Sequence, residues 1–453
     1  MNTFKITALL SHIQLTSEEL GTCRTALAPL QSNNDDQHAF YEYCFQWKMA
    51  PWIYLQLQKH EFLSLFDRDV IERFENAYQD VKQENENRNK IAMQFLQAFH
   101  EHNIDVIILK GNAFIQTIYD DVGYKKMNDF DILIKSEDWP EIEQIYYDLG
   151  YIPLGFGWSG EKQKPAKYSP TSVPFISTDF NCIIGTQWDL KSSTTHFTVD
   201  TNEMWDTAMP LDFHGIPGKQ LSPEYNLIHL ILHLGVYKCG IRDCMDLYNL
   251  ILSTNLDAER LFSIIKKTNA IQKSRYALEM CCLCSRHIPE EWIQRLPKGK
   301  QSFINKRLRK RLQMVNETGD MHESYNDYFQ DIEKNVIYYY LFPEFHKRIY
   351  YFLRVLRFIY FPDIKHALKF LDKSHKPNIL NKIRGRILGP WFSFSMIAQE
   401  IGWKYGILLY LKMWVDTALS PLNYFISKES YFQYLKKKKI EPNQIKKLVD
   451  NVQ

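Results

Sequence analysis

The chain has 453 residues, of which 45% are hydrophobic, 14% aromatic and 24% charged. This composition excludes a disordered protein, and 18 glycines with 18 prolines exclude collagen-like and low-complexity material. The length predicts two or three domains, with enough buried core to fold without disulfides. Eight cysteines without a CxxC pair are typical of an intracellular protein rather than a disulfide scaffold.

The charge is distributed unevenly. The net charge is +2, but residues 341–453 contain 20 Lys or Arg against 8 Asp or Glu, so that this third carries +12 and the rest −10. Such a basic end predicts a partner with phosphates, either RNA or another nucleic acid, or an anionic membrane surface. The alternative is a solvated basic face without a partner.

The sequence predicts no segment that inserts into a membrane. The start, MNTFKITALLSHIQL, has one Lys and a broken apolar run, which is not the pattern of a signal peptide. No window reaches about 18 uninterrupted apolar residues, so no spanning helix is predicted. We therefore expect a cytoplasmic protein, with peripheral membrane contact at the basic end as a further option.

The predicted elements begin with helices over residues 1–100, where apolar residues recur at three- and four-residue spacing. The β-branched runs 105–110 and 129–134 predict two strands, joined by a turn at Gly111 and a helix. Ser136 is the predicted cap of the next helix, and Gly150 its stop.

Residues 151–190 are β-rich and punctuated by Gly and Pro, and the chain from residue 221 is mainly helical again. The fold class is therefore α+β, with a small mixed sheet flanked by helices and embedded between helical regions. We expect a helical N-terminal region, an α+β domain, a helical domain and a basic, aromatic-rich helical C-terminal region, at residues 1–84, 85–215, 216–330 and 331–453.

The strongest chemical signal is NDFDILI, in which Asp129 and Asp131 are separated by one residue on a predicted strand. Side chains alternate along a strand, so both carboxylates face the same way while Phe130 and Ile132 face the other. Two adjacent carboxylates repel each other unless a cation lies between them, and Mg²⁺ held also by substrate phosphates is a common solution. The alternative is two acids on a solvated strand face.

The turn before this strand suits a phosphate. Gly111 permits close backbone approach, and Lys110 adds a point charge. The N–H groups that open the following helix are further donors. Without the two aspartates, an ordinary strand-to-helix turn would explain Lys110 and Gly111 equally well.

These residues resemble a known family. The stretch VIILKGNAFIQTIYDDVGYKKMNDFDILIKSEDWPEIEQIYYDLGY is similar to the uncharacterised nucleotidyltransferase family of bacteria, with its LKG turn and DxDxLV strand. The resemblance continues in order through GTQWDL, MWDTAMPLDFHGI and LSPEYNLIHLILHLGVYKCGIRDCMDLYNLI. It covers roughly residues 85–255 and implies the minimal nucleotidyltransferase fold of the DNA polymerase beta superfamily.

The resemblance also implies roles for residues. Asp129 and Asp131 would be the metal-binding pair, Gly111 and Asn112 the first motif, and Lys125 a substitute for the family's usual Arg. The family's third acid is missing, because Gly185 and Gln187 stand where an acid and a His are expected before Trp188. Its substitute is Asp189, which shares strand parity with Gly185 if the strand continues, or alternatively Asp179.

The sequence supports a functional role less strongly for the other polar groups. His229 and His233 share a helix face, but the pattern lacks the glutamate of zinc proteases, so packing or hydrogen bonding is favoured over a metal role. Arg242, Asp243 and Asp246 are read as surface ion pairs rather than pocket residues. The cysteines at 239, 244 and 281–284 have the wrong spacing for a common zinc site and are read as small buried hydrophobes.

The basic end contains RIYYFLRVLRFIYF (348–361) and GILLYLKMWVDTALSPLNYF (406–425). Aromatic residues interleaved with Arg and Lys are typical of a helical core with snorkelling cations, which we favour, and of an interfacial amphipathic helix. The clusters at 306–311 and 436–439 suit RNA or a lipid headgroup.

Three functions follow from these patterns. The first is a nucleotidyltransferase, dependent on Mg²⁺ or Mn²⁺, that moves a nucleoside monophosphate from an NTP to a small-molecule, peptide or protein acceptor and releases pyrophosphate. Asp129, Asp131 and Asp189 would be catalytic, and Lys110, Gly111, Asn112 and Lys125 would bind the nucleotide. The second is a degenerate nucleotide- or partner-binding protein on the same fold. The third, a DxD glycosyltransferase, expects an α/β half before the DxD, where helices are predicted instead.

Overall fold

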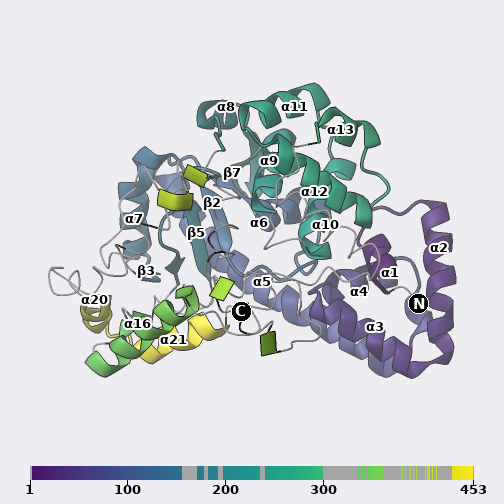
Figure 1. Cartoon of the computed structure of the whole chain (residues 1–453), viewed down its shortest axis with the longest axis horizontal. Helices are drawn as coiled ribbons and strands as arrows, with labels where there is room; N and C mark the ends of the chain where they lie inside the picture. The colour runs from purple at the N-terminus through teal and green to yellow at the C-terminus, as the bar shows by residue number, and fades with distance from the viewer. Residues whose placement is uncertain are drawn as a thin grey trace. The chain divides into compact units, whose positions relative to one another are not determined.

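The structure is a computed structural model. It describes residues 3–155, 171–177, 182–191, 197–234, 240–298, 341–342, 344–360 and 431–451, with single residues or short runs at 335–339 and 379–415. The chain forms two compact units. Figure 1 labels the helices and strands by which these units are described below. The first comprises Met1–Ile134 and Val199–His322, and the second Lys135–Thr198 and Glu323–Gln453.

The N-terminal part of the first unit is helical, as predicted. Its helices have local reasons to start where they do: Thr16 and Glu19 form a capping box before α2, and the side chain of Asn33 caps α3. Pro51 lies in the first turn of α4, where its missing N–H costs nothing. The helices are α1 Thr3–Leu10, α2 Ser17–Leu27, α3 Asn34–Gln46, α4 Ala50–Lys59 and the long α5 Arg68–Glu101, with short 3-10 turns at Ala28–Ser32 and Leu63–Leu65.

The strands of the first unit form a mixed arrangement in the order β6-β7-β1-β2. β1 (Ile107–Ile108) pairs antiparallel with β2 (Phe130–Leu133) and parallel with β7 (Ile216–Gln220), and β6 (Met209–Phe213) forms a hairpin with β7. Both predicted strands are found, although the first is confined to two residues. The helix predicted between them is present as α6 (Lys110–Phe114), continued by a π-helical turn over Ile115–Tyr119.

Six further helices complete the described part of the first unit. α9, α10 and α12 pack against one another through buried apolar faces. His229 is buried on α9, and its ring centroid lies 6.3 Å from that of His233. The helices are α8 Thr201–Asp206, α9 Pro223–His233, α10 Ile241–Ser253, α11 Ala258–Lys267, α12 Ile271–Cys284 and α13 Glu290–Arg295.

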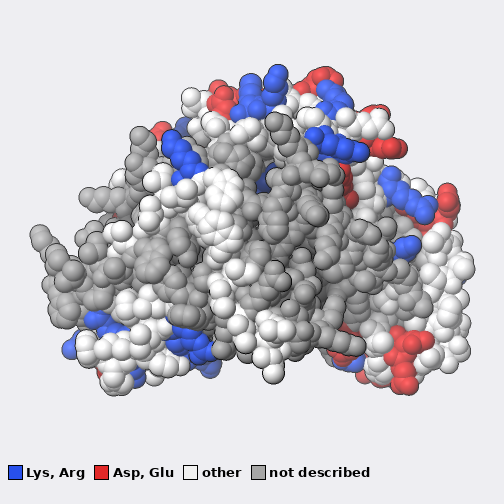
Figure 2. Space-filling model, in the orientation of Figure 1, with Lys and Arg blue, Asp and Glu red and all other residues white. Residues whose placement is uncertain are grey.

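In the second unit, β3 (Ile152–Pro153), β4 (Phe175–Ile176) and β5 (Ile183–Gln187) pair antiparallel in sequence order. α7 (Trp139–Asp148) packs its aromatic residues on them, with the Trp139 and Phe175 rings 6.0 Å apart. The remaining described helices are α16 (Phe345–Tyr360), α20 (Tyr431–Lys437) and α21 (Pro442–Asn451). Figure 2 shows Lys and Arg side chains among uncharged ones over α16 and α21.

One predicted helix boundary is wrong and one is right. Ser136 caps nothing, because residues 136–138 form a 3-10 turn and α7 begins at Trp139, with Pro140 in its first turn. The stop at Gly150 is confirmed. Its φ of +82° lets its N–H and that of Tyr151 bond back to the last turn of α7.

The α+β class with a mixed sheet and flanking helices is confirmed. The predicted four-part domain division remains a prediction. Within the described residues, no helix is long and apolar enough to cross a membrane, and no cluster of three His, Cys, Asp or Glu side chains is placed to hold a metal. The described cysteines are free thiols, all buried except Cys282, while Cys239 lies outside the described residues.

Candidate functional site

The pairing of β1 with β2 determines where Asp131 lies. Ile108 stands opposite Ile132, and the N–H of Leu109 donates to the carbonyl of Asp131 at 3.0 Å. Phe130 and Ile132 are fully buried on one face of β2, as the alternation predicts. Asp131 therefore points to the opposite face, where it is only 5% exposed.

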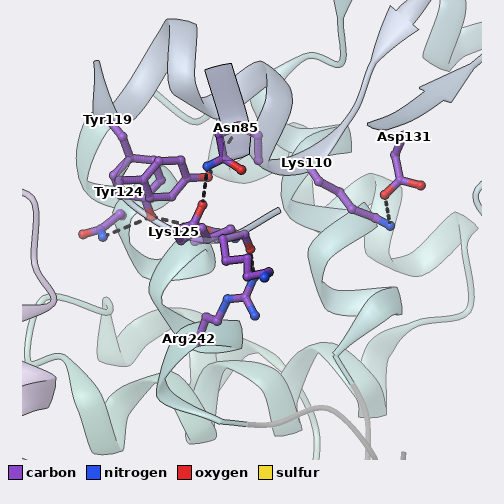
Figure 3. A network of polar contacts seen from close by, with 11 residues as sticks. Asn85, Lys110, Tyr119, Tyr124, Lys125, Asp131 and Arg242 are labelled. Carbon is purple, nitrogen blue, oxygen red and sulfur yellow. Dashed lines mark hydrogen bonds and ion pairs between the residues drawn. The ribbon is translucent and has the colours of Figure 1, made fainter. Parts of the chain in front are cut away.

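Lys110 is the partner of Asp131. Its Nζ lies 2.6 Å from Oδ2 of Asp131 (Figure 3), and both side chains are largely shielded from solvent. Burial opposes the charge on Lys110, but the carboxylates of Asp131 and Asp129 outweigh it and raise the lysine pKa above its ordinary value. Lys110 also has a φ of +54°, a left-handed conformation that costs a non-glycine residue about 1 kcal/mol.

Asp129 lies at the bend just before β2 and is exposed, in contrast to Asp131. The side-chain amide of Asn112, on α6, donates to the Asp129 carbonyl at 3.3 Å. The Oδ1 atom of the same Asn112 is buried and has no hydrogen-bond partner among the described residues. Lys110, Asn112, Asp129 and Asp131, four of the predicted site residues, are thus brought together at one end of β2.

Gly111 is required by close packing rather than by an unusual backbone angle. A Cβ at this position would lie 2.9 Å from Oη of Tyr124, 3.2 Å from the sulfur of Met127 and 3.3 Å from Cε of Lys125. These three neighbours belong to loop 120–128, the segment between the π-helical turn and β2. Gly111 therefore lets loop 120–128 lie directly on the start of α6.

Lys125 was also predicted to bind the nucleotide. Its side chain is turned away from Asp131 and Lys110 (Figure 3). It forms an ion pair with Asp246 of α10, whose side chain is 6% exposed. Tyr119 donates to the other Asp246 oxygen at 2.9 Å, and Asn249 donates to Tyr119 at 3.3 Å. Burial lowers the pKa of Lys125, an effect that Asp246 opposes and Arg242 reinforces. We call Lys125, Asp246, Tyr119 and Asn249 the clamp.

Loop 120–128 is also fixed from α5. The side-chain amide of Asn85 donates to the carbonyls of Val122 and Lys125 at 2.7 and 2.8 Å, and its oxygen accepts from the N–H of Met127 at 3.3 Å. Arg242 adds a hydrogen bond to the carbonyl of Lys126. Side chains of both α5 and α10 therefore hold loop 120–128 in place.

The reading of Arg242, Asp243 and Asp246 as surface ion pairs is wrong for Asp246, which is buried and paired with Lys125. Asp243 instead accepts from the backbone N–H of Gly240 at 2.9 Å, at the start of α10. The available signal was the segment CMDLYNL, in which Asp246 is surrounded by apolar neighbours. An acid in such a stretch is usually buried with a partner. Nothing in the sequence around Asn85 and Tyr119 predicted their contacts in the same way.

Asp189, the predicted substitute for the third acid, does not lie on β5. β5 ends at Gln187, and Asp189 follows in a bend, so the parity that linked it to Gly185 does not extend to it. Burial raises the pKa of Asp189 to about 6, while hydrogen bonds from the backbone of Lys191 and Leu190 act in the opposite direction. Asp189 belongs to the second unit and the aspartate pair to the first. Asp179 lies outside the described residues, and the identity of the third acid remains a prediction.

No curated protein matches the chain. A family model described as an uncharacterised nucleotidyltransferase matches residues 33–285, more than half of the chain, and includes the aspartate pair, the Lys110 turn and the clamp. The match confirms the resemblance seen over residues 85–255 and extends it in both directions, and it supports nucleotidyl transfer as the general activity. The chain belongs to this uncharacterised nucleotidyltransferase family.

Proposed function

We propose that the protein transfers a nucleoside monophosphate from an NTP to an acceptor, with a divalent cation held by Asp129 and Asp131. The observation that supports this most directly is the group of charges at the end of β2. Asp129 and Asp131 both act on the charge of Lys110, and both offer carboxylate oxygens at the same end of β2. Two carboxylates close together at a partly buried site favour a hard cation.

The residues present fit Mg²⁺ or Mn²⁺ better than zinc. Both acids offer oxygen ligands, and among the described residues no third His, Cys, Asp or Glu completes a protein cage. A cation bound by two carboxylates takes its remaining ligands from water and substrate phosphates, which is the usual mode for Mg²⁺. Such a cation, when bound, neutralises the charge that spreads over the phosphate oxygens during transfer.

In this proposal Lys110 has two partners in turn. Without nucleotide, its ammonium group neutralises Asp131 at 2.6 Å. With the triphosphate and cation bound, Lys110 would move to a phosphate oxygen and leave Asp131 to the cation. The neighbouring carboxylates raise the Lys110 pKa in the pair with Asp131, and a phosphate oxygen would likewise favour the charged form. Gly111 lets loop 120–128 pack on the start of α6, next to Lys110, and the clamp holds the loop there.

The test combines donor binding with transfer. The full chain is incubated with each NTP, labelled at the α-phosphate, with Mg²⁺ or Mn²⁺ and a cell extract as the source of acceptor. Melting temperature, pyrophosphate release and label incorporation are followed. The variant is Asp129→Asn/Asp131→Asn, and the control is Asp105→Asn, which removes one negative charge from the exposed ion pair with Lys219.

The expected result is metal-dependent stabilisation by at least one NTP, with transfer that the double variant loses and Asp105→Asn retains. Transfer by the double variant at the wild-type rate would reject the assignment of the two aspartates. Stabilisation by an NTP without pyrophosphate release would favour the second candidate, a binding protein on this fold. The observation that motivates this candidate is the presence of Gly185 and Gln187 where the family's acid and His are expected.

A further inference from the structure

Large apolar side chains lie exposed on α16 of the second unit. Phe345, Ile349 and Leu353 are 71%, 41% and 55% exposed, and they recur every four residues along the helix. Residues at this spacing lie on one helix face. The opposite side of α16 is packed: Val355 is buried, and Arg348 is buried with a hydrogen bond of 3.0 Å to Tyr339. The helix is therefore docked on one side and apolar on the exposed side.

The same spacing occurs twice more, farther along the basic end. At least half of each side chain is exposed in the first set, Ile379, Ile383, Ile387 and Trp391. About half of each is exposed in the second set, Trp403, Ile407, Leu411 and Val415. All eight are helical. We call these two sets and the α16 set the three apolar ladders. Elsewhere in the described part of the chain, the exposed large hydrophobic residues are scattered singly: Phe45, Leu149 and Met209.

The charges between the ladder residues are all of one sign. The segments 345–357, 379–391 and 403–415 contain no Asp or Glu. Besides the buried Arg348 they contain eight cations, namely Lys347, which pairs with Glu344 just before the first segment, Arg354, Arg357, Lys382, Arg384, Arg386, Lys404 and Lys412. A ladder meant to bind an ordinary protein surface would be expected to carry both signs. Apolar stripes with cations alone match a surface that is apolar inside and anionic outside.

We propose that the three apolar ladders bind the surface of an anionic lipid bilayer. The apolar side chains would enter the region between headgroups and acyl chains, and the neighbouring Lys and Arg would pair with lipid phosphates. Trp391 and Trp403, one at the end of the second ladder and one at the start of the third, are residues enriched at this depth of a membrane. The helices would lie in the interface, consistent with the finding that no described helix is suited to cross it.

The exposure of α16 argues against the core interpretation of its own segment. The segment 348–361 was favoured as core with snorkelling cations, yet α16 buries Arg348 and exposes Ile349 and Leu353. A core helix would show the reverse arrangement. The arrangement on α16 instead leaves an apolar face for an outside partner.

The test uses the full chain and sedimentation with vesicles. One set of vesicles is phosphatidylcholine alone, and the other is phosphatidylcholine mixed with phosphatidylserine. Two ladder variants are compared, Phe345→Ser/Ile349→Ser/Leu353→Ser and Ile379→Ser/Ile383→Ser/Ile387→Ser. The matched control, Phe45→Ser/Leu149→Ser/Met209→Ser, removes three exposed apolar side chains outside the ladders. Because all nine positions are at least one-third exposed, the variants should fold, which their melting temperatures check.

The wild-type chain and the control should bind the anionic vesicles and bind neutral ones more weakly, with affinity that falls as salt is raised. Each ladder variant should bind about 100-fold more weakly, since three apolar contacts are lost. Equal weakening in the control would overturn the proposal, as would the absence of binding to anionic vesicles. Binding of single-stranded RNA without binding of vesicles would overturn it in favour of RNA. Self-association lost in the ladder variants, with vesicle binding unchanged, would overturn it in favour of a second copy. None of these readouts depends on nucleotidyl transfer.

Discussion

The first unit contains two buried lysine–aspartate pairs that differ in what surrounds them. Lys110 and Asp131 lie beside a second carboxylate, Asp129, which is exposed and helps to raise the lysine pKa. At the Lys125–Asp246 pair, burial and Arg242 lower the lysine pKa against the effect of Asp246 and Asp243, and Asp246 also accepts a hydrogen bond from Tyr119. The first pair borders an exposed acid at the end of β2, whereas the second ties loop 120–128 to α10. The same two residue types thus lie at a candidate binding site in one place and hold a loop in the other, and their surroundings distinguish them.

The largest expected difference is in stability. Lys125→Met leaves Asp246 buried without its cation, which should lower the free energy of unfolding by about 3–5 kcal/mol. Lys110→Met also leaves a buried aspartate without its cation, but it should cost less, about 2–3 kcal/mol, because the Lys110 side chain is 22% exposed against 12% for Lys125. Urea unfolding of both variants measures the difference, with Lys219→Met at the exposed Asp105 pair as a control within about 0.5 kcal/mol of wild type. Equal losses at Lys110 and Lys125 would break the comparison.

The second-largest effect is expected at Gly111, which follows Lys110 in the chain and packs against loop 120–128, the loop that contains Lys125. Alanine normally stabilises a helix relative to glycine, but here its Cβ would press on Tyr124 at 2.9 Å. Gly111→Ala should therefore lower the free energy of unfolding by about 1–3 kcal/mol. Adding Tyr124→Phe removes the nearest atom and should recover part of the loss. A Gly111→Ala protein as stable as wild type would show that loop 120–128 is not packed as tightly as described.

A smaller effect should appear in metal binding. If Lys110 and the divalent cation compete for Asp131, Lys110→Met should bind Mn²⁺ about tenfold more tightly without nucleotide and bind NTP more weakly. Isothermal titration with Mn²⁺ alone and then with NTP separates the two effects. Lys125→Met, if folded, should leave the Mn²⁺ affinity unchanged. A weaker Mn²⁺ affinity in Lys110→Met would contradict the exchange of partners.

The smallest effect is a dependence on pH. The pKa of Lys125 is lower in the folded protein than its unfolded value of about 10.4. Between these two values the unfolded state binds more protons, so this residue should make the free energy of unfolding rise with pH in that window, and the contribution should be lost as pH falls through the folded pKa. Unfolding measured from pH 8 to 11 should show this slope in wild type and Lys110→Met but not in Lys125→Met. An unchanged slope in Lys125→Met would assign it to other groups.

The sequence predicted the composition of the site better than its geometry. The alternation in DFDILI placed Asp131 and its two apolar neighbours on opposite faces, because strand periodicity is a local property. The contact between Lys110 and Asp131 depends on the pairing of two very short strands, whose register cannot be read from either one. The Lys125–Asp246 pair joins residues 121 positions apart, and nothing in the local pattern of either residue names the other.

The errors have equally local causes. Ser136 has the residue type of a helix cap, but a 3-10 turn before Pro140 shifts the helix start to Trp139. Asp189 was linked to Gly185 by assuming that a strand continued, and β5 ends two residues too early. Both predictions depended on where an element begins or ends, which side-chain periodicity determines poorly.

The side chain of Asn85 donates to two backbone carbonyls of loop 120–128 and accepts from one backbone N–H. Deamidation would convert this amide to a carboxylate. The NH2 group would be replaced by an oxygen atom of similar size. This change would nevertheless turn both donated bonds into repulsions between oxygen atoms, at the support of the loop that carries Lys125. The support of loop 120–128 from α5 therefore depends on a single amide nitrogen.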